Sequence, residues 1–439
     1  MTRAAGWGRA FGEPPWGADA WIAYIAPDRG LALVCDPARN GTAVVESPDA
    51  AFLSRCSPPV EPERPAPGVG RDREPGAPTA AGRLRFPYGP VTFGLFEAGR
   101  IDLLTPGERV VSVRPQAGYK HREIDRTVVG WRPGEALPWI ERRVGPFSVA
   151  HADTFLSATE SAAGRPVREQ ELWLRALGAE LQRIHVHLGH IGRSVEAAGQ
   201  PVATAQFAAL AEEARRAMGR WGGHRWLFGL LDPNYPLRRL ERPELRRLAE
   251  EVGTIRRRFD RLWELARATR IYIDRLQSTA VLDRAAALAL GAVGPVARGS
   301  GIGWDDRVAD PIPPYDRLDL HPAVESEGDA LARILVRVEE IRQSAQLVEQ
   351  ISDRWPGPLG EIDPRPAVAP GRGWARSESP AGDLVYDVTL GEGRITAINV
   401  RTASAANWPA FAHALRGSVF TDFHFAWESF GLSFAETDG

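Results

Sequence analysis

Apolar residues recur at alternating spacings of three and four along several long segments of this 439-residue chain. The three longest stripes cover residues 174–191, 245–262 and 331–348, and a shorter one covers 207–214. This spacing places the apolar side chains on one face of a helix. Helices that each carry one apolar face bury it against one another, so the pattern predicts a long antiparallel helix bundle.

Short β-type patterns precede and follow the bundle segments. Before them, strands are expected at 91–96, 101–104 and 109–113. After them, 384–390 and 395–400 flank the turn Gly391-Glu-Gly393, which predicts a hairpin. A helix bundle with β elements from both the N- and C-terminal parts is an α+β fold.

The first 82 residues divide from the rest by composition. Residues 57–82 are crowded with Pro, Gly and charge and lack apolar periodicity, which is typical of a linker. Residues 1–56 are expected to form a small α+β or β accessory segment, with a hairpin around Pro27-Asp-Arg-Gly30. The main domain is then predicted to be 83–439.

Composition excludes several classes of function. The 54 basic and 56 acidic residues leave the chain nearly neutral, which argues against a nucleic-acid partner. Lys120 is the only lysine, and no phosphate-binding loop ends in it. Cys35 and Cys56 are the only cysteines, too few for a disulfide framework, a four-thiolate zinc site or a cysteine-ligated iron–sulfur cluster. No apolar leader or membrane-spanning run is evident, so a cytoplasmic location is expected.

Local motifs for catalysis are weak. His185, His187 and His190 lie close in sequence, but on a helix only His187 and His190 share a face, so structural histidines are favoured over a metal site. Gly299-Ser-Gly301-Ile-Gly303 lacks the preceding strand and following helix of a nucleotide-binding loop. No nucleophile elbow is present.

Two segments, 118–126 and 137–151, resemble a known family: the large subunit of membrane-bound, energy-converting nickel–iron hydrogenases and its relative, the 49-kDa subunit of respiratory complex I. The residues that match the family's first cysteine motif are Glu141, Arg142, Gly145, Ser148 and His151. The resemblance continues from about residue 86 to the end of the chain, through 178–188, 289–316 and 327–344. It implies the hydrogenase large-subunit/complex I 49-kDa fold.

The resemblance also shows what this chain lacks. The four metal-binding cysteines of the hydrogenases correspond here to Val144, Phe147, Ser433 and Glu436. Soft thiolate ligands are not replaced by these side chains, so no metal is expected.

Quinone chemistry, as in complex I, is only partly supported. Family histidines correspond to Thr92 and Phe96, and the tyrosine that faces the quinone corresponds to Gly145. Ala381 replaces a family arginine. No directly bound cofactor is therefore expected, although a quinone stays possible.

Asp125, on the second expected β element, corresponds to a glutamate of the family. Together with Arg142 and His151 it is the candidate for a relict proton path. An ordinary ion pair and a structural histidine are the favoured interpretation.

The resemblance implies a cofactor-free large subunit of a membrane-associated oxidoreductase complex, NADH-, formate- or quinone-linked, peripheral on the cytoplasmic face of the inner membrane. Implied partners are an iron–sulfur small subunit, which would carry the clusters, and antiporter-like membrane subunits. A non-catalytic scaffold or coupling role is the alternative.

Overall fold

The computed structural model describes most of the chain beyond residue 83. The described residues are 21–26, 31–36, 41–46, 78–79, 83–91, 98–119, 121–231, 241–357 and 370–438, with side chains from residue 84 onward. Of the predicted site positions, Thr92 and Phe96 lie outside them, as does Cys56.

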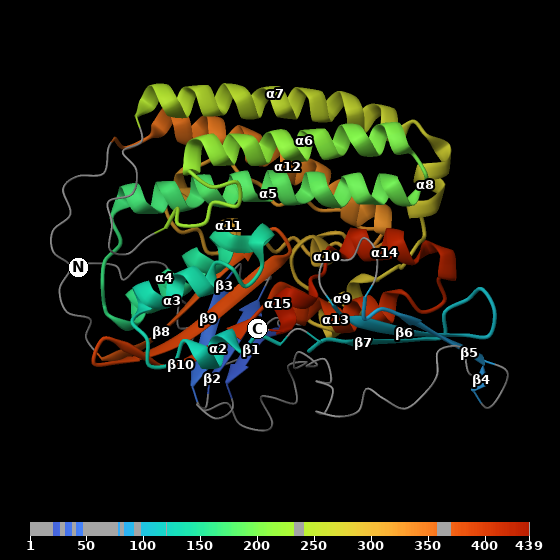
Figure 1. Cartoon of the computed structure of the whole chain (residues 1–439), viewed down its shortest axis with the longest axis horizontal. Coiled ribbons are helices and arrows are strands. Elements are labelled where there is room, and N and C mark those ends of the chain that lie inside the picture. Colours follow the sequence, from blue (N-terminus) through green and yellow to red (C-terminus); the bar gives the residue numbers. More distant parts are fainter. Residues whose placement is uncertain are drawn as a thin grey trace.

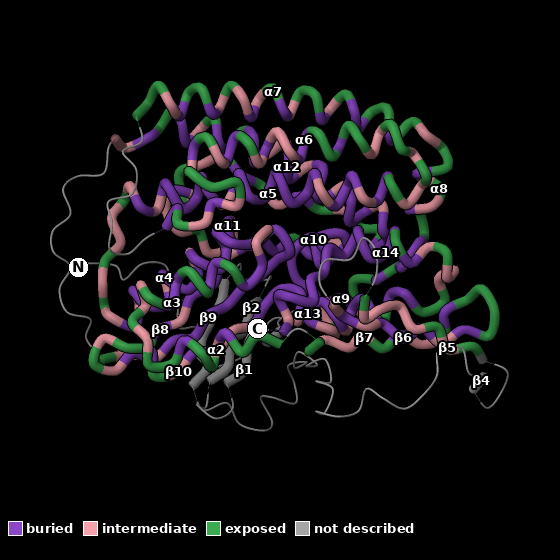
Figure 2. Tube along the Cα trace, in the orientation of Figure 1, coloured by how far each residue is buried: buried purple, intermediate pink, exposed green. Residues whose placement is uncertain are grey.

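Four long helices form the predicted bundle and lie as the upper layer in Figure 1. They are α5 (Glu169–Ala197), α6 (Pro201–Gly222), α7 (Arg242–Arg267) and α12 (Ala330–Arg354). The apolar stripe of α7 is buried, whereas its outer side is exposed, and α5 and α12 are buried along most of their length (Figure 2). α7 begins with Pro243 in its first turn and a capping box between Glu241 and Glu244. The bundle prediction is confirmed.

A three-stranded antiparallel sheet lies below the bundle, in the order β10-β9-β8. Its strands are β8 (Gly371–Ser379), β9 (Gly382–Gly391) and β10 (Arg394–Arg401), so the predicted C-terminal hairpin is confirmed and β8 is an addition. Helix α4 (Ser148–Ala162) packs across β8 and β9. The approach is close because Gly373 has no side chain: a Cβ atom there would lie 2.1 Å from the backbone nitrogen of Ala162.

A second antiparallel sheet contains β4 (Pro78–Thr79), β5 (Arg83–Tyr88), β6 (Arg100–Thr105) and β7 (Ser112–Gln116). Its buried residues form one core with the C-terminal helices α13 (Ala403–Ala414), α14 (Phe423–Phe430) and α15 (Phe434–Asp438). The strand predicted at 101–104 is confirmed, but 109–113 overlaps β7 only at its end, and Val91 lies in a bend. Asp125 does not lie on a strand: it belongs to the short helix α2 (Ile124–Thr127).

Shorter helical turns connect these elements, and three N-terminal strands form a sheet of their own. The turns are α3 (Pro133–Ile140), η3 (Gly145–Phe147), α8 (Arg270–Leu276), α9 (Arg284–Ala289), α10 (Gly294–Arg298), α11 (Asp306–Ala309), η4 (Tyr315–Arg317) and η5 (Phe420–Asp422). The strands are β1 (Trp21–Ala26), β2 (Leu31–Asp36) and β3 (Gly41–Glu46), in which the predicted β1–β2 hairpin is present. Within the described residues, no helix is both long and apolar enough to cross a membrane.

Candidate functional site

Two consecutive arginines follow α3 and point in different directions. Arg143 is buried and forms an ion pair with Asp125 of α2. Arg142 is half exposed, pairs with Glu141 and lies 4.5 Å from the centroid of the Phe228 ring. The arginine beside Asp125 is therefore Arg143 rather than Arg142, and the Asp125 carboxylate is 36% exposed rather than buried.

His151 lies in the first turn of α4 and is completely buried. Its Nδ1 is 2.8 Å from the hydroxyl oxygen of Tyr386 on β9, and Arg143 also hydrogen-bonds Tyr386. Burial, and then the positive charge of Arg143, hold the pKa of His151 well below its usual value. A neutral imidazole thus ends a line of polar groups that starts at the half-exposed Asp125.

Glu436 of α15 lies just beyond His151. Its Oε2 accepts a hydrogen bond from the backbone N–H of Ser404 at 3.0 Å, and its Oε1 is 3.9 Å from His151 Nε2. Neither Oε1 nor Nε2 has a hydrogen-bond partner within the described part of the chain. Burial raises the pKa of Glu436 to about 7, because no cation adjoins this carboxyl group closely enough to offset desolvation. A proton added at neutral pH can therefore settle on Glu436.

The structure brings into one region the four positions that are expected to correspond to the family's cysteines. Val144 and Phe147 pack in a buried apolar cluster whose other members are Val186, Val293, Ala381, Ala403, Ala406 and Ala435. Ser433 and Glu436 hydrogen-bond each other and Ser404 at its edge. A centre of nickel and iron needs soft thiolates, and these residues offer one carboxylate and one hydroxyl among hydrocarbon. They do not fit that group, and no cluster of His, Cys, Asp or Glu in the described residues could hold a metal ion.

Gly145, which the resemblance is expected to align with the quinone-facing tyrosine, opens η3 beside the loop after α6. A Cβ atom at this position would meet Phe228 at 3.7 Å and Trp226 at 3.9 Å. Two aromatic rings thus stand where a tyrosine side chain would project.

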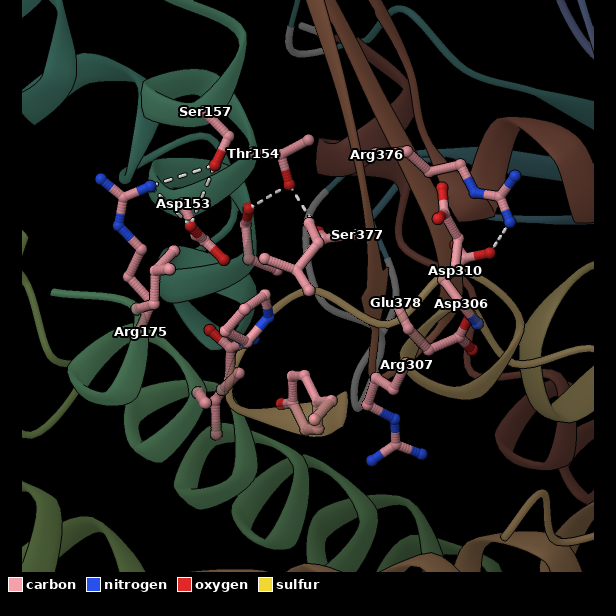
Figure 3. A pocket seen from close by; sticks show the side chains of 18 of the residues that line it. Asp153, Thr154, Ser157, Arg175, Asp306, Arg307, Asp310, Arg376, Ser377 and Glu378 are labelled. Carbon is pink, nitrogen blue, oxygen red and sulfur yellow. Dashed lines mark hydrogen bonds and ion pairs between the residues drawn. The ribbon is translucent and has the colours of Figure 1, made fainter. Parts of the chain in front are cut away.

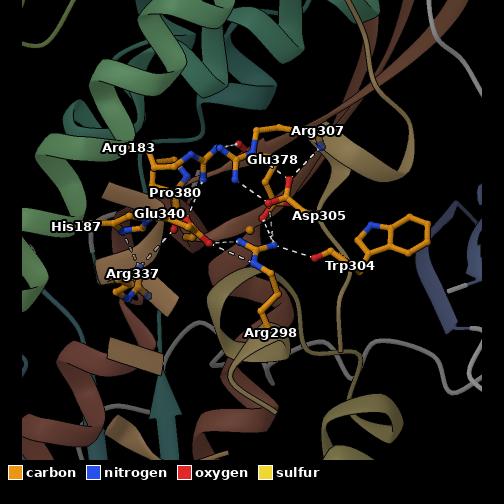
Figure 4. Close-up of polar contacts among 12 residues, drawn as sticks. Arg183, His187, Arg298, Trp304, Asp305, Arg307, Arg337, Glu340, Glu378 and Pro380 are labelled. Atoms are coloured by element: carbon orange, nitrogen blue, oxygen red, sulfur yellow. Dashed lines mark hydrogen bonds and ion pairs between the residues drawn. The ribbon is translucent and has the colours of Figure 1, made fainter. Parts of the chain in front are cut away.

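A buried ionic network, shown in Figure 4, lies between the bundle and β8. Arg298 at the end of α10 donates hydrogen bonds to Glu340 of α12 at 2.6 Å and to Glu378 of β8 at 2.8 Å. Arg307 of α11 binds Asp305 at 2.7 Å and Glu180 of α5 at 3.1 Å. The segment 291–315 is thereby held to two bundle helices and one strand.

His187 belongs to this network. Arg337 donates to its Nδ1 at 3.1 Å, so the ring is neutral, with its proton on Nε2, which donates to Glu340 at 2.7 Å. Burial lowers the pKa of His187 to about 3. Although burial opposes it, the charge of Arg298 keeps the pKa of Glu340 well below its usual range. His187 is therefore structural, as the sequence favoured, and His190 likewise hydrogen-bonds a buried carboxylate, that of Glu428.

Known proteins resemble this chain in sequence and structure. Residues 238–370 match the family described as respiratory-chain NADH dehydrogenase, 49 Kd subunit. An NADH-quinone oxidoreductase subunit of Salinispora tropica is 32% identical over 348 residues, which cover 76% of this chain and 87% of that protein. The chain belongs to the complex I 49-kDa family.

Hydrogenase-type members of the same group are nearly as similar. The membrane-bound hydrogenase subunit alpha of Pyrococcus furiosus is 26% identical over 77% of this chain and 83% of that protein. A solved chain of the membrane-bound sulfane sulfur reductase, an archaeal respiratory membrane complex, has a TM-score of 0.75 and 26% identity over 81% of this chain and 98% of its own. The expected fold, that of the hydrogenase large subunit and the complex I 49-kDa subunit, is confirmed.

Some residues of this site have no recognisable signal in the sequence. The local sequence does not distinguish the buried Arg143 from its exposed neighbour. Tyr386 likewise has the sequence context of any strand residue, so neither could be recognised as part of the site. Glu340 and Arg298 fell within matched motifs, yet their pairing spans 42 positions. For Arg298 the available signal was its place at the end of the otherwise uncharged stretch 285–297, where a charge needs a partner.

Proposed function

We propose that this protein is the large-subunit component of a membrane-associated oxidoreductase complex and that it holds no metal centre of its own. The observation that carries the proposal is the apolar cluster around Val144 and Phe147. It lies in a chain that has the fold of the family. NADH-, formate- or quinone-linked electron transfer and ion translocation are then activities of the complex. The chain contributes its scaffold and couples its neighbours to one another.

The proposed partners are an iron–sulfur small subunit, which carries the clusters, and antiporter-like membrane subunits. Support comes from a relative named as a membrane-bound hydrogenase subunit and from a structural neighbour that belongs to a respiratory membrane complex. The proposed location is peripheral, on the cytoplasmic face of the inner membrane.

A second candidate is reduction of a quinone next to the apolar cluster. The line of polar groups from Asp125 through Arg143 and Tyr386 to His151 favours it, because a reduced quinone needs protons delivered from solvent. Asp125 supplies the exposed end of such a line, and Glu436 lies at its buried end.

The decisive experiment is affinity purification from the native host, with metal analysis and identification of the co-purifying chains. We expect an iron–sulfur protein and membrane subunits, and iron in proportion to the small subunit without nickel. One nickel per chain overturns the metal-free proposal. Recovery of the chain alone overturns its place in a complex.

The two roles are separated by measuring quinone reduction in the purified complex with Asp125→Asn and His151→Ala. The scaffold role predicts unchanged turnover in a fully assembled complex, whereas the quinone role predicts a loss of at least tenfold. Arg126→Ala is the matched control, since Arg126 lies on α2 beside Asp125 but is 84% exposed. A loss of turnover in the control as well would indicate disturbance of α2 rather than of proton delivery.

A further inference from the structure

The outer side of α7 carries a row of arginines that face solvent. Between residues 246 and 261, the exposed charged side chains of this helix are one glutamate, Glu250, and five arginines. The arginines are Arg246, Arg247, Arg257, Arg258 and Arg261. This stretch is strongly basic, although the whole chain has a net charge of −2. A local excess of positive charge attracts anions to this side of the molecule.

Four of the five arginines have no carboxylate partner within the described part of the chain. Arg258 pairs with Glu213 of α6. By contrast, Arg257 donates to the hydroxyl oxygen of Thr254 at 2.9 Å, and Arg261 donates to a backbone oxygen of α7 at 3.4 Å. Guanidinium groups that no carboxylate holds are available to an anion from outside. The four, called the arginine row below, are Arg246, Arg247, Arg257 and Arg261.

Charged side chains in other parts of the molecule pair with one another. In the pocket between α4 and α5, Arg175 lies 3.3 Å from Asp153, and Arg376 is paired with Asp306 (Figure 3). Even Glu251, a partly buried acid of α7, is bound by an arginine of α6. The arginine row lacks such partners among the described residues, so its charge is left uncompensated at the surface.

The arginine row runs along the outermost helix of the bundle. One side of α7 packs on α6 and α12, and the opposite side is exposed along the upper edge of the molecule (Figure 1, Figure 2). The row extends from Arg246 to Arg261, a distance of about 22 Å at the rise of an α-helix. Leu265 follows Arg261 by about one turn and is 70% exposed, and Ile271 of α8 is 67% exposed. The surface therefore offers a positively charged ridge, at whose end two aliphatic side chains protrude.

We propose that the outer side of α7 binds the surface of a membrane that contains anionic lipids. Guanidinium groups bind phosphate through paired hydrogen bonds, and a bilayer presents phosphates over its whole plane, so each arginine of the row can meet one. Leu265 and Ile271 enter the boundary between headgroups and acyl chains, as the aliphatic side chains of interfacial helices do.

The two aliphatic side chains and the length of the row favour a bilayer over other polyanions. A nucleic acid offers phosphates but no apolar medium for Leu265 and Ile271. An acidic protein would have to supply carboxylates in register with four arginines spread along one helix. The proposal adds a direct lipid contact to the peripheral location proposed above, but it rests on neither the partner subunits nor the absence of a metal.

The test measures cosedimentation of the purified full-length chain with lipid vesicles. Vesicles of phosphatidylcholine and phosphatidylglycerol in equal parts should bind the chain saturably, and vesicles of phosphatidylcholine alone should bind it at least about tenfold more weakly. Binding should weaken as salt is raised, because exposed charges are screened. Absence of binding to the mixed vesicles, or equal binding to both kinds, overturns the proposal. Either result leaves the proposed function standing, because no partner subunit takes part in the measurement.

Three variants locate the contact, and each is checked for an unchanged melting temperature. Loss of the row's charge should weaken binding to the mixed vesicles at least about tenfold; this variant combines Arg246→Gln, Arg247→Gln, Arg257→Gln and Arg261→Gln. A matched control removes four exposed arginines from outside the bundle and should bind as the wild type does; it combines Arg114→Gln, Arg126→Gln, Arg394→Gln and Arg416→Gln. Leu265→Ser together with Ile271→Ser should weaken binding several-fold, since less apolar surface is buried.

The variants and two further polyanions decide between the possible partners. Undiminished binding by the folded row variant, or an equal loss in the control, overturns the proposal, because the contact then lies elsewhere or follows net charge alone. Undiminished binding by the Leu265→Ser, Ile271→Ser variant overturns the entry of these side chains into the bilayer. A DNA duplex of mixed sequence and polyglutamate are titrated against the same chain. Tighter binding of either than of the mixed vesicles would assign the row to a nucleic acid or to an acidic protein and overturn the lipid proposal.

Discussion

Glu436, at a position expected to correspond to a metal ligand of the hydrogenases, is a buried acid, and its environment sets how the stability of the protein responds to pH. Its pKa is raised from the ordinary 4.5 to about 7. The folded state therefore holds this proton at pH values where the unfolded chain has lost it, so the stabilising contribution is present at low pH and disappears as pH rises from about 4.5 through 7.

The first prediction isolates this group. The free energy of unfolding of the wild type, minus that of Glu436→Gln, should fall by on the order of 3 kcal/mol between pH 4.5 and 7.5. The difference is used because the buried neutral histidines, among them His151 and His187, change stability in the opposite direction over part of this range. Urea unfolding at several pH values measures it. A difference independent of pH would mean that Glu436 titrates normally.

The contacts between residues near this acid were only partly predictable from the sequence. Val144, Phe147, Ser433 and Glu436 lie in one region although two of them are near the start and two near the end of the main domain. The sequence could not predict which of Arg142 and Arg143 turns inward. The direction of a side chain in a turn depends on the backbone path and on the group opposite it, which here is Asp125. Long-range partners of this kind leave no local pattern.

At the level of elements, the ionic network fixes the loop 291–315 to the bundle. Arg298 is the residue on which it centres, because its guanidinium binds two carboxylates from different elements. Both carboxylates, Glu340 and Glu378, are buried, so losing their cation leaves uncompensated charge.

The second prediction follows: Arg298→Met should lower the free energy of unfolding by about 3–5 kcal/mol. Arg270→Met, which removes an arginine from an exposed pair on α8, should change it by less than about 0.5 kcal/mol. Chemical denaturation of both variants measures the effect. If Arg298→Met were as stable as the control, the network would be held by its other arginines alone.

The third prediction concerns the start of α12. Asp329 caps this helix by accepting from the backbone N–H of Ala332 at 2.8 Å, and it also accepts from the N–H of Ser278 at 2.8 Å. Asp329→Ala should cost about 1–2 kcal/mol of stability, whereas Asp329→Asn, which keeps a side-chain oxygen, should lose clearly less. Thermal unfolding by circular dichroism compares them. Equal losses would assign the effect to the charge rather than to the cap.

Elements differ in how visible they are in the sequence, for a physical reason. The helix α7 lies at the surface with one buried stripe, and its pattern predicted it correctly. The helix α4 is buried on nearly all sides, between the bundle and β8–β9. Its sequence therefore lacks the alternation of apolar and polar positions that reveals a surface helix. Strand β8 was missed because its buried residues include Arg376 and Glu378, which read as surface residues until their partners are known.

For the whole molecule, the proposed division is an N-terminal accessory unit, a linker and the main domain. The strands β1, β2 and β3 pair only with one another among the described strands, and the next sheet begins at β4. The main domain has its own core clusters, one through the bundle and the β8–β10 sheet and one through the second sheet and the C-terminal helices. Because no described strand joins the first 56 residues to these clusters, their removal should cost the main domain little.

The fourth prediction is that a chain starting at residue 57 unfolds within about 2 °C of the full-length protein, since a loss of 1 kcal/mol would shift a domain of this size by about that much. Differential scanning calorimetry measures it. A matched truncation at residue 106, which removes β5 and β6 from the second sheet, should abolish cooperative unfolding, because Ile101 and Leu103 are completely buried in the core that α13 and α14 share. A drop of 5 °C or more on removing residues 1–56 would place the accessory unit within the main cooperative fold and refute the division at the linker.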